Sequence, residues 1–184
     1  PNMTVLSPCD AREAYLMTRL AHDIDGPVYI RLAREKSPVI FSDEYKKRDT
    51  KSPVVVFARP EPHAKKGCIF VTGPIIYEAL LAARELEKKD IQVAVVNLSV
   101  IKPLPDEAIV RFASQYKNII TLEEHQKVGG MGSAVCELLS DRHPTKVIRM
   151  GIDNRFGQSG VSAELYKEYG ISKDDIIKTC LENI

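Results

Sequence analysis

The chain has 184 residues and a formal net charge of +1; 44% of its residues are hydrophobic and 28% are charged. A protein of this length buries roughly two thirds of the surface that its unfolded chain exposes, which allows one sizeable core. The balanced charge argues against nucleic acid or membrane as a partner. No apolar run approaches the roughly 20 residues that span a bilayer, and no leader-like segment opens the chain, so we expect a cytoplasmic protein.

The four cysteines lie far apart, at positions 9, 68, 136 and 180. Because no CxxC pair occurs, we expect free and mostly buried thiols rather than disulfides or a metal site. The chain begins at Pro1 without a methionine, and a strand pattern starts within its first few residues. We therefore expect it to be a section of something longer.

The first 41 residues predict one β-α-β unit. An apolar run over residues 3–6 indicates a strand, and Asp10 then caps a helix, with Glu13 three residues later completing a capping box. A turn with glycine and proline leads to a second strand over residues 28–32. One such unit is too small to be a domain of its own.

A charged segment over residues 42–52 follows this unit and has no apolar period, so we interpret it as a linker or surface loop. Its basic residues, Lys46, Lys47 and Arg48, are expected to form a solvated face, with a basic binding patch as the alternative. We place the boundary between the two parts of the chain here, with a first part over residues 1–52 and a second over 53–184.

The second part alternates strands with helices, which predicts an α/β fold: a three-layer α/β/α sandwich with a mostly parallel sheet. Strands are expected over residues 54–57, 68–71, 91–98, 119–122 and 146–150. Helices are expected to follow Thr72-Gly73-Pro74, Pro103 and Pro105, to run from Met131, and to begin after Ser172. The segment GIDNRFGQSG at 151–160 is expected to be a polar loop.

A polar and glycine-rich cluster lies between the strand at 119–122 and the next helix. Its members are Glu123, Glu124, His125, Gly129, Gly130 and Gly132. Such a cluster is typical of the carboxyl edge of an open α/β sheet, where ligands and partners usually lie. Its glycines permit sharp turns and a close approach of the backbone. Adjacent residues that leave a strand point in different directions, so the three polar side chains cannot converge on one atom. We therefore favour a hydrogen-bonded loop or a subunit contact over an acid–base set.

The glycine spacing falls short of the GxGxxG pattern of dinucleotide sites, and no GxSxG, P-loop or HExxH motif occurs. The residues alone make no complete active site. A free-standing nucleotide-binding α/β domain stays an alternative.

Four ordered stretches resemble the transketolase family. LEEHQKVGGMGSAV at 122–135 is similar to the EEH and GGxGSAV pattern of the family's C-terminal domain. VVNLSVIKPLP at 95–105 and GIDNRFGQSG at 151–160 resemble two further segments of that domain. GPVYIRLAREKSP at 26–38 resembles the end of the family's pyrimidine-binding domain.

The resemblance implies transfer of a two-carbon ketol unit between sugar phosphates, with thiamin diphosphate and Mg²⁺ in the complete enzyme. It further implies that the diphosphate- and metal-binding domain and the activating glutamate lie outside this chain. We therefore expect no cofactor bound to this fragment, no activity of the fragment alone, and a role in assembly and dimer stability. The expected partners are an N-terminal transketolase section, or the missing domains, and a second copy in a homodimer.

One substrate-binding residue is implied by the same resemblance. Matching IRLAREKSP to the family places an arginine that binds the sugar phosphate at Arg34. Arg31 lies three residues earlier and is expected to face the opposite way, which makes it the weaker candidate. The alternative for Arg34 is a salt bridge with Glu35 or another acidic residue. No residue is assigned to catalysis, cofactor or metal.

Deoxyxylulose-phosphate synthases and the β subunits of 2-oxo-acid dehydrogenases share the C-terminal domain of the transketolase family. The EEH and RLARE motifs favour transketolase over both. A non-catalytic interaction or regulatory module is the alternative from another class.

Overall fold

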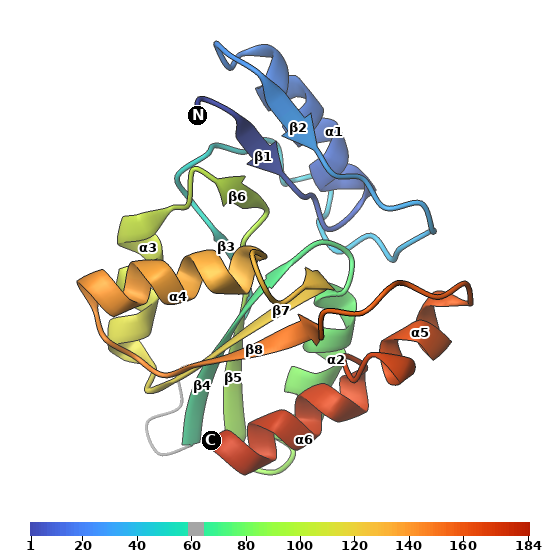
Figure 1. Cartoon of the computed structure of the whole chain (residues 1–184), viewed down its shortest axis with the longest axis vertical. Coiled ribbons are helices and arrows are strands. Elements are labelled where there is room, and N and C mark those ends of the chain that lie inside the picture. The colour runs from blue at the N-terminus through green and yellow to red at the C-terminus, as the bar shows by residue number, and fades with distance from the viewer. Residues whose placement is uncertain (59–64) are drawn as a thin grey trace.

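The computed structural model describes residues 1–58 and 65–184, which form two sheets (Figure 1). The larger sheet has the strand order β3-β5-β4-β7-β8. Its strands are β3 (Val54–Phe57), β4 (Lys65–Thr72), β5 (Ile91–Asn97), β7 (Asn118–Gln126) and β8 (Val147–Ile152). β4 pairs in parallel with β5 and β7, and β8 with β7, whereas β3 runs antiparallel to β5. The prediction of a mostly parallel sheet is confirmed.

Helices cover both faces of this sheet because its strands are apolar on both sides. Along β4, Ile69 and Val71 join the core beneath α2 (Ile76–Glu87) and α6 (Lys173–Asn183). Cys68 and Phe70 alternate with them and pack under α3 (Asp106–Gln115) and α4 (Met131–Arg142). This two-residue period is what a fully buried strand requires. The predicted three-layer α/β/α sandwich is therefore confirmed.

The N-terminal unit lies above this sandwich in Figure 1. β1 (Thr4–Leu6) and β2 (Val28–Ile30) are parallel and are joined by α1 (Ala11–His22), so the β-α-β prediction is confirmed. A three-residue strand, β6 (Val100–Lys102), pairs antiparallel with β1 and was not predicted. Leu6, Met17 and Val100 share a small core. Residues of the second part of the chain thus complete the sheet of the first.

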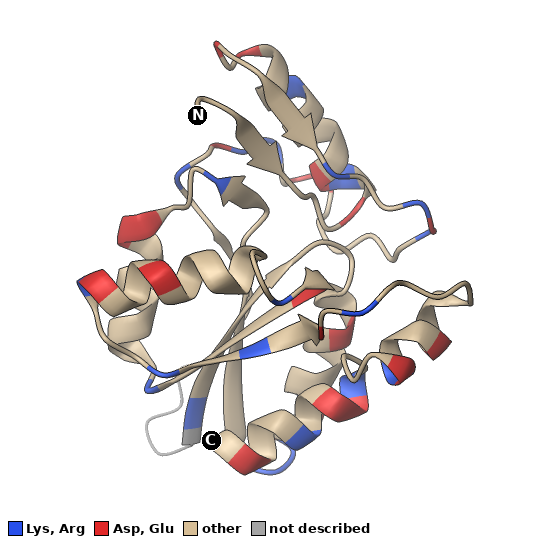
Figure 2. Ribbon diagram, viewed as in Figure 1, with Lys and Arg blue, Asp and Glu red and all other residues tan. Residues whose placement is uncertain are grey.

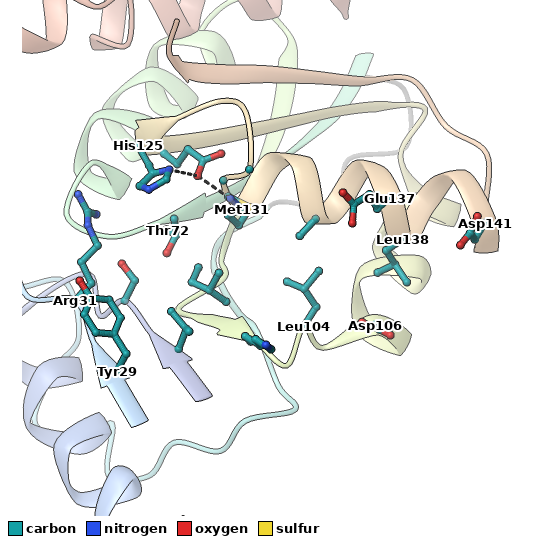
Figure 3. Close-up of a pocket in the computed structure, with 18 residues that line it drawn as sticks. Tyr29, Arg31, Thr72, Leu104, Asp106, His125, Met131, Glu137, Leu138 and Asp141 are labelled. Carbon is teal, nitrogen blue, oxygen red and sulfur yellow. Dashed lines mark hydrogen bonds and ion pairs between the residues drawn. The ribbon is translucent and has the colours of Figure 1, made fainter. Parts of the chain in front are cut away.

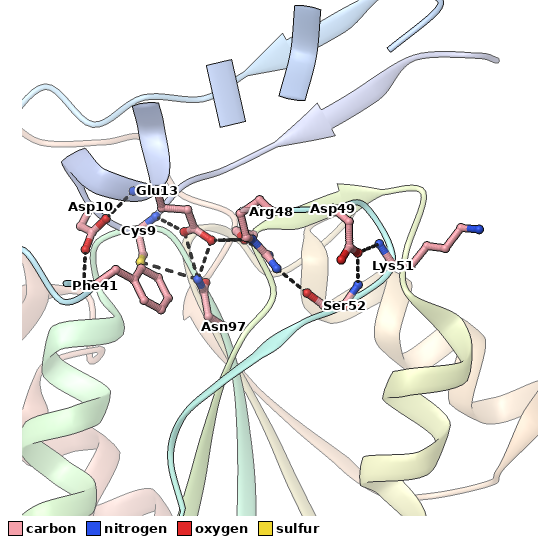
Figure 4. A network of polar contacts seen from close by, with 10 residues as sticks. Cys9, Asp10, Glu13, Phe41, Arg48, Asp49, Lys51, Ser52 and Asn97 are labelled. Atoms are coloured by element: carbon pink, nitrogen blue, oxygen red, sulfur yellow. Dashed lines mark hydrogen bonds and ion pairs between the residues drawn. The ribbon is translucent and has the colours of Figure 1, made fainter. Parts of the chain in front are cut away.

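The predicted capping box at the start of α1 is only half formed. Asp10 caps the helix by accepting a hydrogen bond from the Glu13 backbone nitrogen at 2.7 Å. The Glu13 carboxylate does not return to the Asp10 backbone; it accepts from the Cys9 nitrogen at 2.8 Å and from Ser99 Oγ at 2.6 Å. Glu13 is fully buried, so its carboxylate serves tertiary structure rather than the helix end (Figure 4).

The expectation that Arg48 belongs to a solvated face is wrong. Only 6% of Arg48 is exposed, and its guanidinium contacts Ser99 Oγ, the Ser52 carbonyl and the Glu13 carboxylate. The segment 42–52 has no helix or strand, as expected of a linker. Its Arg48 side chain is nevertheless buried, because it pairs with the buried carboxylate of Glu13.

Several element boundaries differ from the sequence expectation. β7 continues to Gln126 instead of ending at Leu122, and β2 stops at Ile30. A short helix, α5 (Ser162–Glu168), was not predicted, and none of its residues is buried. The four cysteines are free and three of them are buried, as expected. Among the described residues, no helix has the length and apolarity needed to cross a bilayer.

Candidate functional site

Glu123 is a buried carboxylate that closes the N-terminus of α4. It is 2% exposed and accepts hydrogen bonds from the backbone nitrogens of Met131 at 2.7 Å and Gly132 at 2.8 Å. These bonds satisfy donors that the first turn of a helix leaves free. Burial raises the pKa of the Glu123 carboxyl, and the two N–H donors partly oppose that rise.

The glycines around this carboxylate are required by close packing. A Cβ atom on Gly130 would lie 2.3 Å from Glu123 Oε2 and 2.5 Å from the Gln126 carbonyl oxygen. A Cβ atom on Gly132 would lie 2.4 Å from Thr121 Oγ1. Gly129 instead has a φ of +73°, in the left-handed region. The predicted sharp turn and close approach are both present, at different glycines.

Glu124 points away from Glu123, as the alternation of a strand predicts, whereas His125, two residues on, lies on the same face as Glu123. The Glu124 carboxylate accepts a hydrogen bond from the Tyr166 hydroxyl of α5 at 2.6 Å. His125 is half exposed, and its Nδ1 lies 4.0 Å from Glu123 Oε2. Because Glu124 lies on the other face, the three side chains do not converge on one atom and form no common acid–base set.

A cleft of about 770 Å³ lies between the N-terminal unit and α4 (Figure 3). Its polar end is lined by Ser7, Arg31, Thr72, Glu123 and His125. Its apolar part is lined by Val5, Ile101, Leu104, Met131 and Leu138. In the part of the chain that the structure describes, the buried hydroxyls of Ser7 and Thr72 have no hydrogen-bond partner. The cleft has the size of a ligand site and the apolar lining of a contact surface.

A second cavity, of about 450 Å³, contains Arg34. It is bounded by the segment that follows β2, by the N-terminus of α2 and by α5, which contributes Tyr166. Arg34 is exposed, and no carboxylate among residues 1–58 and 65–184 forms an ion pair with it. The alternative of a salt bridge with Glu35 is therefore not formed. The guanidinium stays available to an anion in this cavity.

Arg31 lines both the cleft and the cavity of Arg34. Its Nη2 donates a hydrogen bond to the backbone carbonyl of Glu124 at 2.9 Å. The expectation that Arg31 and Arg34 face opposite ways assumed one continuous strand, but β2 ends at Ile30, so strand alternation does not relate the two. In the described ranges, no three His, Cys, Asp or Glu side chains gather to hold a metal ion.

Sequence reasoning missed two participants. Tyr166 belongs to the helix that was not predicted, and no local pattern marks it. Thr72 was noticed only as the opening of a helix, although it ends β4 opposite Glu123 and lines the cleft. A hydroxyl residue at the carboxyl end of a predicted parallel strand was the signal that could have indicated it.

Comparison with known proteins identifies the family of this chain. The model of the transketolase C-terminal domain matches residues 58–176. The chain is 36% identical over 182 residues to a subunit of the apulose-4-phosphate transketolase of Phocaeicola vulgatus, covering 99% of the chain and 56% of that protein. It is 35% identical over 180 residues to 1-deoxy-D-xylulose-5-phosphate synthase of Desulfitobacterium hafniense, covering 97% of the chain and 28% of that protein.

A solved structure, described as an inactive β4 tetramer of a split-gene transketolase, superimposes with a TM-score of 0.90 at 33% identity. The match covers all of this chain and 58% of that one. The chain thus spans only part of the length of each of these relatives. It belongs to the transketolase family, whose C-terminal domain it carries.

Proposed function

We propose that the chain is the C-terminal part of a thiamin-diphosphate-dependent transketolase that transfers a two-carbon ketol unit between sugar phosphates. The domain match and the likeness to one polypeptide of a split transketolase support this proposal. In it, residues 1–52 are the end of the pyrimidine-binding domain and its linker, and residues 53–184 are the C-terminal domain. The chain assembles in the cytoplasm with an N-terminal section or the missing domains, and forms a homodimer.

Thiamin diphosphate supplies the carbanion chemistry when it is bound to the assembled enzyme. This chain offers no side-chain cluster for the accompanying metal among its described residues. In our proposal, residues outside this chain hold both groups. The part that we assign to this chain is the binding and orientation of the substrate.

The observation that carries this role is the exposed guanidinium of Arg34 in its own cavity. A guanidinium can meet a phosphate through two parallel charge-assisted hydrogen bonds, which fix both position and orientation. We propose that Arg34 binds the phosphate of the sugar and so sets the distance between the reacting carbon and the fixed end of the substrate. Such positioning makes the reaction effectively unimolecular.

The test is Arg34→Ala in the enzyme assembled with its other section. Phosphorylated substrates should bind about ten- to a hundredfold more weakly, which corresponds to the loss of one or two charged hydrogen bonds. Unphosphorylated substrates should be nearly unaffected. Arg34→Lys should recover part of the loss, because lysine keeps the positive charge but cannot form the two parallel hydrogen bonds of a guanidinium. Arg84→Ala, at another exposed arginine, is the matched control. Equal losses for both substrate types would show that Arg34 supports the fold instead.

A second candidate is a deoxyxylulose-phosphate synthase, since a relative of that name is 35% identical to this chain. The assembled enzyme discriminates the two. Ketol transfer between sugar phosphates supports the transketolase proposal, and formation of 1-deoxy-D-xylulose 5-phosphate supports the alternative. If the assembled protein has neither activity but the chain is required for assembly, it is an interaction module.

A further inference from the structure

The segment that carries Arg34 is held by hydrogen bonds only at its two ends. At its start, the Arg31 backbone nitrogen donates to the Leu6 carbonyl at 2.8 Å. At its finish, the backbone nitrogens of Ile40 and Phe41 donate to Asp10 Oδ2 at 2.7 and 2.8 Å. Among the hydrogen bonds of the described residues, none involves residues 32–39. The position of Arg34 therefore depends on these two attachments.

The attachment at Arg31 reaches across the molecule to the edge of the large sheet. The Arg31 guanidinium donates to the Glu124 carbonyl at 2.9 Å, a contact between residues 93 positions apart. In Figure 3, Arg31 lies at one end of the cleft together with Tyr29, on the strand that leads into the segment. Glu124 lies in β7 directly after Glu123, the last residue paired with β4, and within the stretch between Leu122 and Gln126 where the register with β8 shifts. The guanidinium thus ties a loosely held segment to the sheet.

Glu124 is itself held from the other side by α5. The Tyr166 hydroxyl donates to Glu124 Oε1 at 2.6 Å and also lines the cavity of Arg34. Burial, and then the neighbouring Glu124 carboxylate, raise the pKa of Tyr166, so its hydroxyl keeps its proton and remains the donor. The cavity is therefore bounded on two sides by groups that meet at one residue of β7.

We propose that Arg31, Glu124 and Tyr166 form a positioning relay that fixes the segment 31–38 and so presents the Arg34 guanidinium to a substrate phosphate. The inference rests on the proposed function of Arg34 and names three residues that do not touch the phosphate themselves. Tyr166 holds the Glu124 side chain, the Glu124 backbone carbonyl holds the Arg31 guanidinium, and Arg31 fixes the start of the segment. Their contribution should appear as weaker phosphate binding, because a misplaced guanidinium loses hydrogen-bond geometry.

The kinetic test uses Tyr166→Phe and Arg31→Gln in the enzyme assembled with its other section. The KM of phosphorylated substrates should rise about two- to tenfold, the equivalent of one hydrogen bond, while their kcat changes little. Unphosphorylated substrates should keep their KM, and Arg31→Lys should recover part of the loss. Tyr169→Phe is the matched control, because its hydroxyl bonds the backbone nitrogen of Gln158 and not Glu124.

A second measurement reports the segment directly and needs no activity. Trypsin cleaves after Arg34 and Lys36, so the rate of cleavage there measures how firmly the segment is held. Native-state cleavage should be faster in Tyr166→Phe than in the unmodified chain and unchanged in Tyr169→Phe. Equal cleavage in all three would overturn the relay.

The outcomes separate the relay from the proposed function. If Arg34→Ala weakens phosphorylated substrates selectively but Tyr166→Phe and Arg31→Gln do not, the relay is wrong and the role of Arg34 stands. If the relay variants weaken both substrate types equally, the three residues only support the fold, and the relay is again overturned. If Arg34→Ala has no phosphate-selective effect, the role of Arg34 and the relay fail together.

Discussion

Glu13 and Arg48 form an ion pair inside the protein, with the Arg48 Nε atom 3.1 Å from Glu13 Oε1 and side-chain exposures of 2% for Arg48 and 0% for Glu13. Asn97 adds a hydrogen bond to Glu13 Oε2 at 2.9 Å, and Ser99 adds one to Oε1. The network joins α1, the linker and the end of β5 (Figure 4). It crosses the boundary that we place between the two parts of the chain, a boundary that stays a prediction.

Removing one partner of this pair should be strongly destabilising. Arg48→Met leaves the Glu13 carboxylate buried beside only neutral donors, and such a change costs about 3–5 kcal/mol of unfolding free energy. Urea denaturation of the chain measures this loss. Glu13→Gln together with Arg48→Met should recover part of it, because no buried charge is left without a partner. Arg12→Met, at an arginine whose partner Asp43 is exposed, should cost far less.

Gly130→Ala should destabilise the fold by a few kcal/mol, because its Cβ atom would overlap Glu123 Oε2 and the Gln126 carbonyl. Gly130→Val should be at least as damaging. Gly157→Ala is the control, since a Cβ atom there meets nothing within 4 Å. Thermal melts that shift equally for Gly130→Ala and Gly157→Ala would show that the turn tolerates a side chain.

The Glu123 carboxyl should make stability depend on pH. Its folded-state pKa is raised above the usual 4.5, chiefly by burial, so the folded protein holds this proton more tightly than the unfolded chain does. The resulting stabilisation is complete below the unfolded pKa and is lost as the pH rises through the folded pKa. His125 and Arg149 act in the opposite direction and limit the effect.

The comparison with Glu123→Gln isolates this group, since glutamine does not titrate. The unfolding free energy of the unmodified chain, relative to that of the variant, should fall as the pH rises from about 4 through the raised pKa of the folded state. A difference that stays constant over this range would show that the carboxyl titrates alike in the folded and unfolded chains.

The chain alone should neither bind thiamin diphosphate nor turn over sugar phosphates, because the groups that hold and activate the cofactor are, in our proposal, supplied by another section. Isothermal titration calorimetry with thiamin diphosphate and Mg²⁺ provides the check. Tight binding of thiamin diphosphate to the isolated chain would contradict our proposal that another section holds the cofactor.

The large sheet and its helices could be predicted because their signal is local. The continuous apolar run in β4 and the apolar stripe of α4 follow from neighbours in the sequence. β6 escaped prediction because its three residues become a strand only by pairing with β1, about 95 positions earlier in the chain. None of the seven residues of α5 is buried. The segment therefore lacks the periodic apolar pattern from which a helix could be predicted.

Buried charges were the part of the structure that composition could not reveal. Arg48 lies in a run of lysines and acids that resembles any solvated segment, and its burial is set by Glu13, which lies far from it in the sequence. The separation of Glu124 from Glu123 and His125 could be predicted, since it needs only the geometry of a strand. Their partners could not, because Tyr166 and the α4 N-terminus are brought to them by the tertiary fold.

The carboxylate at the start of α4 also explains what kind of molecule this glycine-rich turn can accept. A helix N-terminus ordinarily attracts phosphate groups, because its free N–H donors and its dipole favour negative charge. Here Glu123 already occupies two of those donors and brings its own negative charge, so an incoming anion meets neither free N–H groups nor a positive field. Despite its glycines, the turn is closed to phosphate. In our proposal, an anionic substrate is bound instead in the neighbouring cavity. Its lining includes Arg31, Arg34 and Lys36 as well as the acidic residues Glu35, Glu78 and Glu124, and Figure 2 shows both signs of charge in the segment that follows β2.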